Sequence, residues 1–164
     1  MRRFYLSLGS NLGDRETNLR RAIEALAKLG EVASVSSFYE TEPVEVVEQP
    51  WFLNCAVALD SGRTPPELLH ALLALEKTMG RQRTQEKGPR NIDIDILLAD
   101  DAIVNTPELT IPHPAMHDRR FVLAPLAEIG GEVIHPQLRK KISELLENLP
   151  PGPAVRRLHE AKSG

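Results

Sequence analysis

The order of strand-like and helix-like segments before residue 100 constrains the fold more than any other feature of this chain. Some segments carry the alternating apolar pattern or the β-branched and aromatic residues of strands, and others carry apolar residues at helical spacing. In chain order they are residues 3–8 (strand), 17–29 (helix), 31–40 (strand), 51–60 (strand), 65–79 (helix) and 92–99 (strand). This order predicts an α+β fold with a ferredoxin-like βαββαβ core.

Both predicted helices have capping residues at one end. Gly30 follows the last apolar residue of the first helix, and we expect it to act as the C-terminal cap. Thr64 precedes the second helix, Pro65 suits its first position, and Glu67 completes a capping box with Thr64. These signals agree with helices that connect neighbouring strands.

The remainder of the chain predicts shorter elements added to this core. Residues 101–114 predict an extra hairpin or strand, and residues 119–130 and 140–149 predict helices. Residues 150–164 have little apolar periodicity, although “AVRRL” within them could add a short strand. A chain of this length can build one proper core, so we expect residues 1–164 to form a single domain.

Composition restricts the compartment and the partners. Hydrophobic residues make up 41% of the chain and charged residues 26%, as in ordinary globular proteins. The net charge of -3 and the pI near 6.0 provide no general attraction to nucleic acid or to anionic membranes. No window is apolar enough for a membrane span or a signal peptide, and the single cysteine, Cys55, excludes an internal disulfide framework. We therefore expect a cytoplasmic monomer with small-molecule partners and a buried Cys55 thiol.

The stretch “GPRNIDIDILLAD”, residues 88–100, places two carboxylates on one face of a strand. Ile92, Ile94 and Ile96 share the apolar face, so Asp93 and Asp95 share the opposite face. Most alternating strands simply expose such a face to water, and that interpretation stays open for this pair. The alternative is a magnesium site, because magnesium often binds through one or two carboxylates together with substrate phosphates.

Basic residues flank this acidic strand on both sides in the sequence. They are Arg81, Arg83, Lys87 and Arg90 before it, and His113, His117, Arg119 and Arg120 after it. Arginine matches phosphate oxygens in geometry and charge, and no GxxxxGK[ST] segment exists to hold phosphate by backbone amides. Each of these residues alone is more simply explained as a solvated charge or a structural histidine. Together with the aspartates, they predict a site for phosphate transfer.

Five motifs of the chain resemble those of a known family. In this order and spacing they are “LGSNLGD”, “SSFYETEPV”, “QPWFLNCAV”, “GPRNIDIDIL” and “IPHPAMHDRRFVLAPLAEI”. They are similar to the 6-hydroxymethyl-7,8-dihydropterin pyrophosphokinases of folate biosynthesis, from about residue 4 to about residue 136. The resemblance implies a ferredoxin-like domain that moves pyrophosphate from ATP to the hydroxymethyl group of the pterin and releases AMP.

The resemblance also implies roles for individual residues, including a site for two magnesium ions. The metal ligands would be Asp93 and Asp95. The residues that contact ATP would be Glu76, Arg81, Arg83, Arg90, Ile96, Thr110, His113 and Arg119. Those around the pterin would be Thr41, Glu42, Pro43, Val44, Phe52, Asn54, Asp93 and Phe121. The residues implied to act in catalysis are Arg81, Arg83, Arg90, Asp93 and Asp95.

The chain departs from the family pattern at two positions. Lys87 stands where other members carry an aromatic residue before “GPR”, and the loop is one residue shorter. Glu108 stands where some members carry a basic residue. By the resemblance, the first position concerns a lid contact over the pterin and the second a contact with the nucleotide. No side chain is an obvious general base, and Asp95 and a metal-bound water are the candidates.

Other function classes fit parts of the sequence. A non-catalytic nucleotide- or metabolite-binding domain could use the same scaffold, because one fold hosts many functions. An RNA-binding module of this topology would need exposed aromatic residues on its central strands and a basic face; Phe52 is the single candidate. Production of AMP when ATP, magnesium and the pterin are mixed with the protein distinguishes the enzyme from both alternatives.

Overall fold

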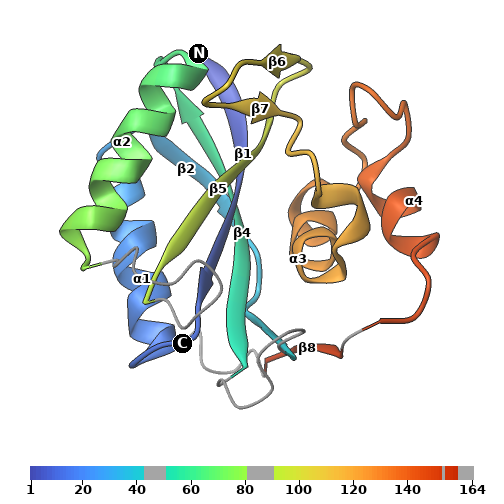
Figure 1. Cartoon of the computed structure of the whole chain (residues 1–164), viewed down its shortest axis with the longest axis horizontal. Coiled ribbons are helices and arrows are strands. Elements are labelled where there is room, and N and C mark those ends of the chain that lie inside the picture. Colours follow the sequence, from blue (N-terminus) through green and yellow to red (C-terminus); the bar gives the residue numbers. More distant parts are fainter. Residues whose placement is uncertain (43–50, 81–90, 153, 159–164) are drawn as a thin grey trace.

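A six-stranded antiparallel sheet forms the centre of the computed structural model, which describes residues 1–42, 51–80, 91–152 and 154–158 (Figure 1). Its strands are β1 (Arg2–Ser10), β2 (Glu31–Val35), β3 (Tyr39–Thr41), β4 (Phe52–Ser61), β5 (Asp93–Ala99) and β8 (Val155–Arg157). The strand order is β5-β1-β4-β3-β8, and β2 pairs with the other half of β4. The first strands and helices therefore form the predicted ferredoxin-like core.

Helices cover both faces of this sheet. Helices α1 (Arg15–Leu26) and α2 (Pro65–Thr78) lie on one face, whereas α3 (Arg120–Gly130) and α4 (Ile142–Glu147) lie on the other (Figure 1). Alternation along β4 supplies both cores. Leu53, Cys55, Val57 and Leu59 pack toward α1 and α2, and Ala56 and Ala58 pack toward α3 and α4. Burial also raises the pKa of the Cys55 thiol, in agreement with the expected buried cysteine.

The segment 31–40, expected as one strand, is divided into β2 and β3 by residues 36–38. Ser36 explains the break, because both its backbone and its side chain bind Ala56. The Ser36 N–H donates to the Ala56 carbonyl, and the Ser36 hydroxyl accepts from the Ala56 N–H, both at 2.9 Å. A side-chain oxygen thus replaces one ladder hydrogen bond, and the edge strand bends at this point.

One cap prediction is confirmed and another is wrong. The Thr64 hydroxyl accepts from the Glu67 N–H at 3.3 Å, and the Glu67 carboxylate accepts from the Thr64 N–H at 2.8 Å. Helix α1, however, ends at Leu26, so Gly30 is not its cap. A Cβ at Gly30 would lie 2.3 Å from the Asp60 carbonyl oxygen, so close approach to β4 explains this glycine.

The predicted elements after residue 99 are also present. The extra hairpin consists of β6 (Val104–Asn105) and β7 (Thr110–Ile111), and a short 3₁₀ helix, Met116–Asp118, leads into α3. The stretch “AVRRL” supplies β8, which pairs with β3 at the edge of the sheet. Among the described residues, no helix is long and apolar enough to cross a membrane.

Candidate active site

One cross-strand row on the α3 face of the sheet brings together residues from five strands. By the pairing register, Asp93 on β5 stands opposite Gly9 on β1, which stands opposite Asn54 on β4. Asn54 pairs in turn with Tyr39 on β3, and Tyr39 pairs with Arg157 on β8. Partners in antiparallel strands point to the same face, so the side chains of this row share one surface. The row places a carboxylate and an amide on either side of a glycine.

The two aspartates of β5 lie as the alternation predicts. Asp93 pairs with Gly9 and Asp95 with Ser7, and both carboxylates are half-buried on the α3 face. Ile92, Ile94 and Ile96, which alternate with the aspartates, pack into the core on the opposite face. Within residues 1–42, 51–80, 91–152 and 154–158, no three acidic, histidine or cysteine side chains gather as a metal cage. Two carboxylates on one face are a donor set that magnesium uses together with substrate oxygens.

His113 lies next to this acidic pair. Its backbone N–H donates to the Leu97 carbonyl at 3.0 Å, which ties it to β5. Burial lowers the pKa of His113, Arg119 lowers it further, and the nearby Asp93 carboxylate partly opposes this shift. The Ala115 N–H donates to His113 Nδ1 at 3.1 Å. In the neutral ring the proton is therefore on Nε2, which can donate to a phosphate oxygen.

The other basic residues near residue 113 divide into two groups. The Arg119 guanidinium lies 5.6 Å from the centre of the Phe121 ring, at the start of α3. Arg120 instead donates to the Leu149 and Pro150 carbonyls at 3.3 and 3.2 Å. The His117 ring lies against His135, with 6.3 Å between ring centres. Of this basic cluster, His113 lies near Asp93, and Arg119 lies near His113.

Three further residues of the predicted ATP site lie on or beside β5. Glu76 is only 3% exposed, and its carboxylate accepts from the Ile94 N–H at 2.6 Å, so it holds the start of β5. Ile96 is 4% exposed and belongs to the core under α1 and α2. Thr110 is exposed on β7. Glu108, the departure from the family pattern, is exposed between β6 and β7.

A buried hydrogen bond orients the amide of the predicted pterin site. The Thr41 hydroxyl donates to Asn54 Oδ1 at 2.8 Å, and both side chains are buried. The amide nitrogen then lies over Gly9, because a Cβ at Gly9 would be only 2.8 Å from Asn54 Nδ2. The same added Cβ would lie 3.7 Å from the Phe52 ring. A side chain at position 9 would therefore occupy the space in front of Asn54.

Two phenylalanines stand on this face, from different elements. Phe52 begins β4 on the same side as Asn54, and Phe121 lies in the first turn of α3 and packs against the second core. Both rings remain partly exposed, so each leaves apolar surface that a planar ligand could cover. Glu42 is exposed, and its carboxylate accepts from the Ala154 N–H at 3.2 Å.

The remaining predicted site residues fall outside the described part of the chain. They are Pro43, Val44, Arg81, Arg83 and Arg90, together with Lys87 of the shortened loop. The structure therefore places the acidic pair, His113, Arg119, the amide and the two rings on one side of the sheet. The arginine loop stays a prediction from the resemblance.

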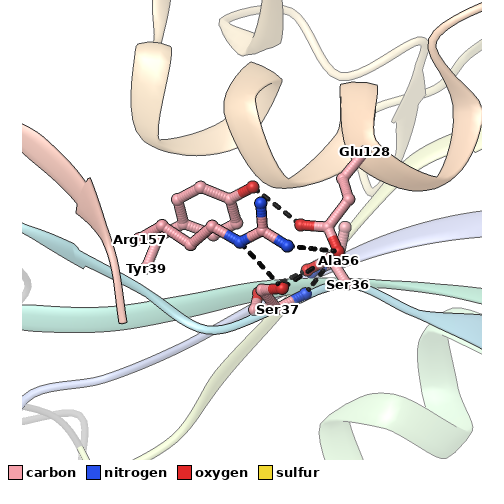
Figure 2. A network of polar contacts seen from close by, with 6 residues as sticks. All are labelled: Ser36, Ser37, Tyr39, Ala56, Glu128 and Arg157. Carbon is pink, nitrogen blue, oxygen red and sulfur yellow. Dashed lines mark hydrogen bonds and ion pairs between the residues drawn. The ribbon is translucent and has the colours of Figure 1, made fainter. Parts of the chain in front are cut away.

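Sequence reasoning missed a polar network that joins α3 to the edge of the sheet (Figure 2). Glu128 on α3 accepts from the Ser37 N–H and the Ser37 hydroxyl, both at 3.0 Å, and from the Tyr39 hydroxyl at 2.7 Å. Arg157 reaches the same Glu128 carboxylate at 3.9 Å and donates to the Ser37 hydroxyl at 3.1 Å. No local pattern links residues this far apart in sequence. Gly9 was missed for a similar reason, since its place beside Asn54 depends on strand register.

Comparison with known proteins gives one family match and several close relatives. A family model described as 7,8-dihydro-6-hydroxymethylpterin-pyrophosphokinase (HPPK) matches residues 5–131. A 2-amino-4-hydroxy-6-hydroxymethyldihydropteridine pyrophosphokinase of Bacillus subtilis is 47% identical over 131 residues, which cover 79% of this chain and 78% of that protein. A protein of the same name from Methylorubrum extorquens is 44% identical over 148 residues, which cover 85% of this chain and 94% of that protein.

Other relatives are longer than this chain. The Folic acid synthesis protein fol1 of Schizosaccharomyces pombe is 40% identical over 89% of this chain, and the match spans only 20% of that protein. A crystal structure of Plasmodium falciparum HPPK-DHPS with pteroate has a TM-score of 0.70 at 17% identity. It covers 89% of this chain and 42% of that protein, and this likeness bears on the fold alone.

Proposed function

Because the chain belongs to the 7,8-dihydro-6-hydroxymethylpterin-pyrophosphokinase family, we propose that it transfers the terminal pyrophosphate of ATP to the hydroxymethyl group of 6-hydroxymethyl-7,8-dihydropterin. It is an ATP-dependent pyrophosphokinase of folate synthesis. The products are AMP and the pterin diphosphate. The match over residues 5–131 carries this function, because it includes the acidic strand and the strands that border it.

Asp93 and Asp95 are the proposed ligands for two magnesium ions. The support is their common face, their half-burial and their pairing with Gly9 and Ser7 on β1. Asp93 and Asp95 would hold the ions, which would supply positive charge to offset the charge that develops on the transferred group. The protein's part is to hold both carboxylates on β5, the edge strand that pairs with β1 and is anchored by its isoleucines in the core, so that their spacing does not change.

The triphosphate then lies beside His113 and Arg119. Neutral His113 donates from Nε2, and Arg119 supplies a charge that is permanent at physiological pH. Arg81, Arg83 and Arg90 complete the phosphate contacts in this proposal, on the basis of the family resemblance alone. Glu76, Ile96 and Thr110 border the nucleotide, with Glu76 acting through β5. Asp93 faces both substrates, because it stands between the phosphate residues and Gly9.

The pterin ring occupies the surface over Gly9 in this proposal. Asn54 presents its amide to the polar edge of the ring, and Thr41 holds that amide in place. Phe52 and Phe121 supply apolar surface for stacking. Thr41, Glu42, Pro43 and Val44 contribute the remaining contacts, by resemblance to the family.

Catalysis in this arrangement depends on position and charge. Phosphoryl transfer requires in-line alignment and stabilisation of the phosphate oxygens, and it requires little covalent participation by the protein. The cross-strand row fixes the distance between the carboxylates that face the phosphate and the amide that faces the pterin. Since both substrates bind to one rigid sheet, their reacting groups are aligned without a covalent intermediate.

Production of AMP tests this function directly. Purified protein should form AMP and pterin diphosphate only when ATP, magnesium and 6-hydroxymethyl-7,8-dihydropterin are all present. A protein that binds ATP and the pterin without forming AMP would instead be a non-catalytic ligand-binding domain. The matched control omits the pterin. AMP that forms without the pterin would come from hydrolysis of ATP and not from transfer of pyrophosphate.

We propose further that the chain is a single-domain monomer of the cytoplasm that does not bind nucleic acid or membranes. The net charge of -3 supports the absence of nucleic-acid and membrane binding, since it gives no general attraction to polyanions. Sedimentation of the purified protein would test the oligomeric state.

A further inference from the structure

The C-terminal strand β8 lies beside the proposed pterin site, yet it falls outside residues 5–131, which the family model matches. We propose that β8 is a positioning element for the pterin half of the site, and that Arg156 and Arg157 are its anchors. This inference rests on the proposed function, since the pterin is the ligand concerned. It assigns a role to a segment that the reaction itself does not use.

The register shows how close β8 comes to the pterin residues. Val155 pairs with Thr41, the residue whose hydroxyl holds the Asn54 amide. The Glu42 N–H also donates to the Ala154 carbonyl at 3.0 Å. Strand β3 has only three residues, so its own pairing with β4 supplies few hydrogen bonds. Without β8, β3 would be an exposed edge strand of only three residues.

Arg156 anchors β8 on the α1 side of the sheet. Its Nε and Nη2 atoms donate to Glu40 Oε1 at 3.1 and 2.9 Å, and its guanidinium lies 4.7 Å from the centre of the Trp51 ring. The second Glu40 oxygen accepts from Arg15 at 2.9 Å, and Arg15 also donates to the Trp51 carbonyl at 2.7 Å. Burial raises the pKa of Glu40, but the hydrogen bonds from both arginines outweigh this and lower it. Glu40 is therefore an anion held between two cations.

This cluster acts at two points that matter for the pterin. Glu40 immediately precedes Thr41, and Trp51 immediately precedes Phe52. Arg156 contacts both Glu40 and Trp51, so one side chain joins the end of β3 to the start of β4. A shift of either point would move a residue of the proposed pterin contact.

Arg157 anchors β8 on the opposite, α3 side (Figure 2). It donates to the Ser37 hydroxyl and lies 3.9 Å from the Glu128 carboxylate. Glu128 belongs to α3, the helix that carries Phe121. The Tyr39 hydroxyl donates to the same carboxylate, so β3, β8 and α3 meet at one acidic group. The network thereby sets where the Phe121 helix stands relative to Thr41 and Asn54.

The two anchors therefore act on opposite faces of one short strand. If β3 leaves its paired position for part of the time, only the remaining fraction of the protein can bind the pterin. The apparent affinity for the pterin then falls in proportion to that fraction. The aspartates and His113 belong to β5 and its neighbours, at the other end of the sheet. The contacts of Arg156 are with Glu40 on β3 and Trp51 before β4, so ATP binding should be insensitive to the loss of Arg156, which a purely structural role in stability would not predict.

The test compares Arg156→Ala, Arg157→Ala and the double variant in the full chain. AMP formation is measured against pterin concentration at saturating ATP and magnesium, and then against ATP at saturating pterin. We expect the pterin KM to rise about tenfold for Arg156→Ala, about threefold for Arg157→Ala and about thirtyfold for both. The ATP KM and kcat should stay within about twofold of the wild type. Arg156→Lys keeps the charge without the guanidinium fork, so it should raise the pterin KM less than Arg156→Ala.

Arg20→Ala is the matched control. Arg20 also pairs with a carboxylate, that of Glu16 at 2.8 Å, and also lies over an aromatic ring, that of Phe38 at 5.2 Å. It belongs to α1, so its loss should leave the pterin KM unchanged. A pterin KM unchanged in the double variant would overturn the inference. Pterin and ATP KM values that rise together with a lower Tm would also overturn it, because β8 would then serve stability alone.

A failure of the proposed function gives a different result. In that case the wild-type protein forms no AMP, whereas β8 is still tested by equilibrium binding of the pterin with a non-hydrolysable ATP analogue. Weaker pterin binding by the double variant supports the inference, and equal binding overturns it.

Discussion

The phosphate half and the pterin half of the proposed site are held in different ways. The phosphate half rests on β5, the strand at the other edge of the described sheet, whose backbone pairs with β1 along most of its length and whose isoleucines anchor it in a core. The pterin half lies toward the β3 edge, where side-chain hydrogen bonds and ion pairs from α1, α3 and β8 hold a strand of three residues. The first arrangement tolerates changes at the surface, whereas the second depends on each of several polar contacts.

This difference matches the chemistry of the two ligands. A metal–phosphate group carries strong charge and needs fixed carboxylates, which a paired strand provides. A neutral heterocycle is recognised by hydrogen bonds at its edge and by stacking, and both are lost when the surrounding groups move by small distances. Variants should therefore separate into those that stop turnover and those that weaken pterin binding alone.

The largest effect should come from Asp93→Asn or Asp95→Asn. Each change removes one proposed metal ligand and keeps the side-chain size, so kcat should fall about a hundredfold or more while Tm changes little. Steady-state kinetics with a magnesium titration measures this. Asp101→Asn, at an exposed position just after β5, is the control. Normal turnover by both variants, with unchanged magnesium dependence, would show that this pair does not hold the metal.

Asn54→Ala should have the next largest effect, and it should fall on the pterin. The change leaves the Thr41 hydroxyl and the pterin edge without a partner, so pterin binding should weaken by about 1 to 3 kcal/mol. ATP binding should be largely retained. Calorimetric titration with each ligand separates the two, with the exposed Asn105→Ala as control. Equal losses of both ligands together with a lower Tm would mark Asn54 as a structural residue.

Gly9→Ala tests the pterin half of the site from β1, the strand that pairs with β4 at Asn54. The new methyl would lie 2.8 Å from Asn54 Nδ2, so it must displace the amide that Thr41 holds. We expect the pterin KM to rise about tenfold, with the ATP KM within about twofold. Gly62→Ala is the matched control, because its added Cβ would meet no atom within 4 Å. A greater loss of ATP binding than of pterin binding would contradict the placement of the pterin over Gly9.

The smallest effect concerns His113 and stability against pH. The pKa of His113 is lowered in the folded protein, so folding favours the neutral ring. Its contribution is therefore complete above the ordinary histidine value of about 6.5 and is lost as the pH falls through the lower folded value. Between about pH 6.5 and the lower folded value, the Tm of the wild type should fall more steeply than the Tm of His113→Gln. Exposed His70→Gln is the control. Parallel Tm curves for wild type and His113→Gln would contradict this assignment.

The phosphate half was the more predictable part of the site from sequence. Alternation alone placed Asp93 and Asp95 on one face, and the capping box located α2 at Thr64. Both signals are local, because they depend on residues within one strand or one turn.

The pterin edge could not be predicted in this way. Ser37 and Glu128 are 91 residues apart in sequence, and Glu40 and Arg156 are 116 apart. Their contacts follow from strand register and from where α3 packs, and no local period encodes either. Gly30 illustrates the same limit, since its true constraint is a carbonyl on another strand, that of Asp60. The break at Ser36 depends likewise on Ala56 across the sheet.

The late position of β8 in the chain has a consequence for synthesis on the ribosome. The strands and helices through β5 end at Ala99, so that core can assemble while the rest of the chain is still being made. The β3 edge must wait for Val155–Arg157, which leave the ribosome among the last described residues. At about 5–20 residues per second, this leaves the edge unpaired for several seconds in every nascent chain.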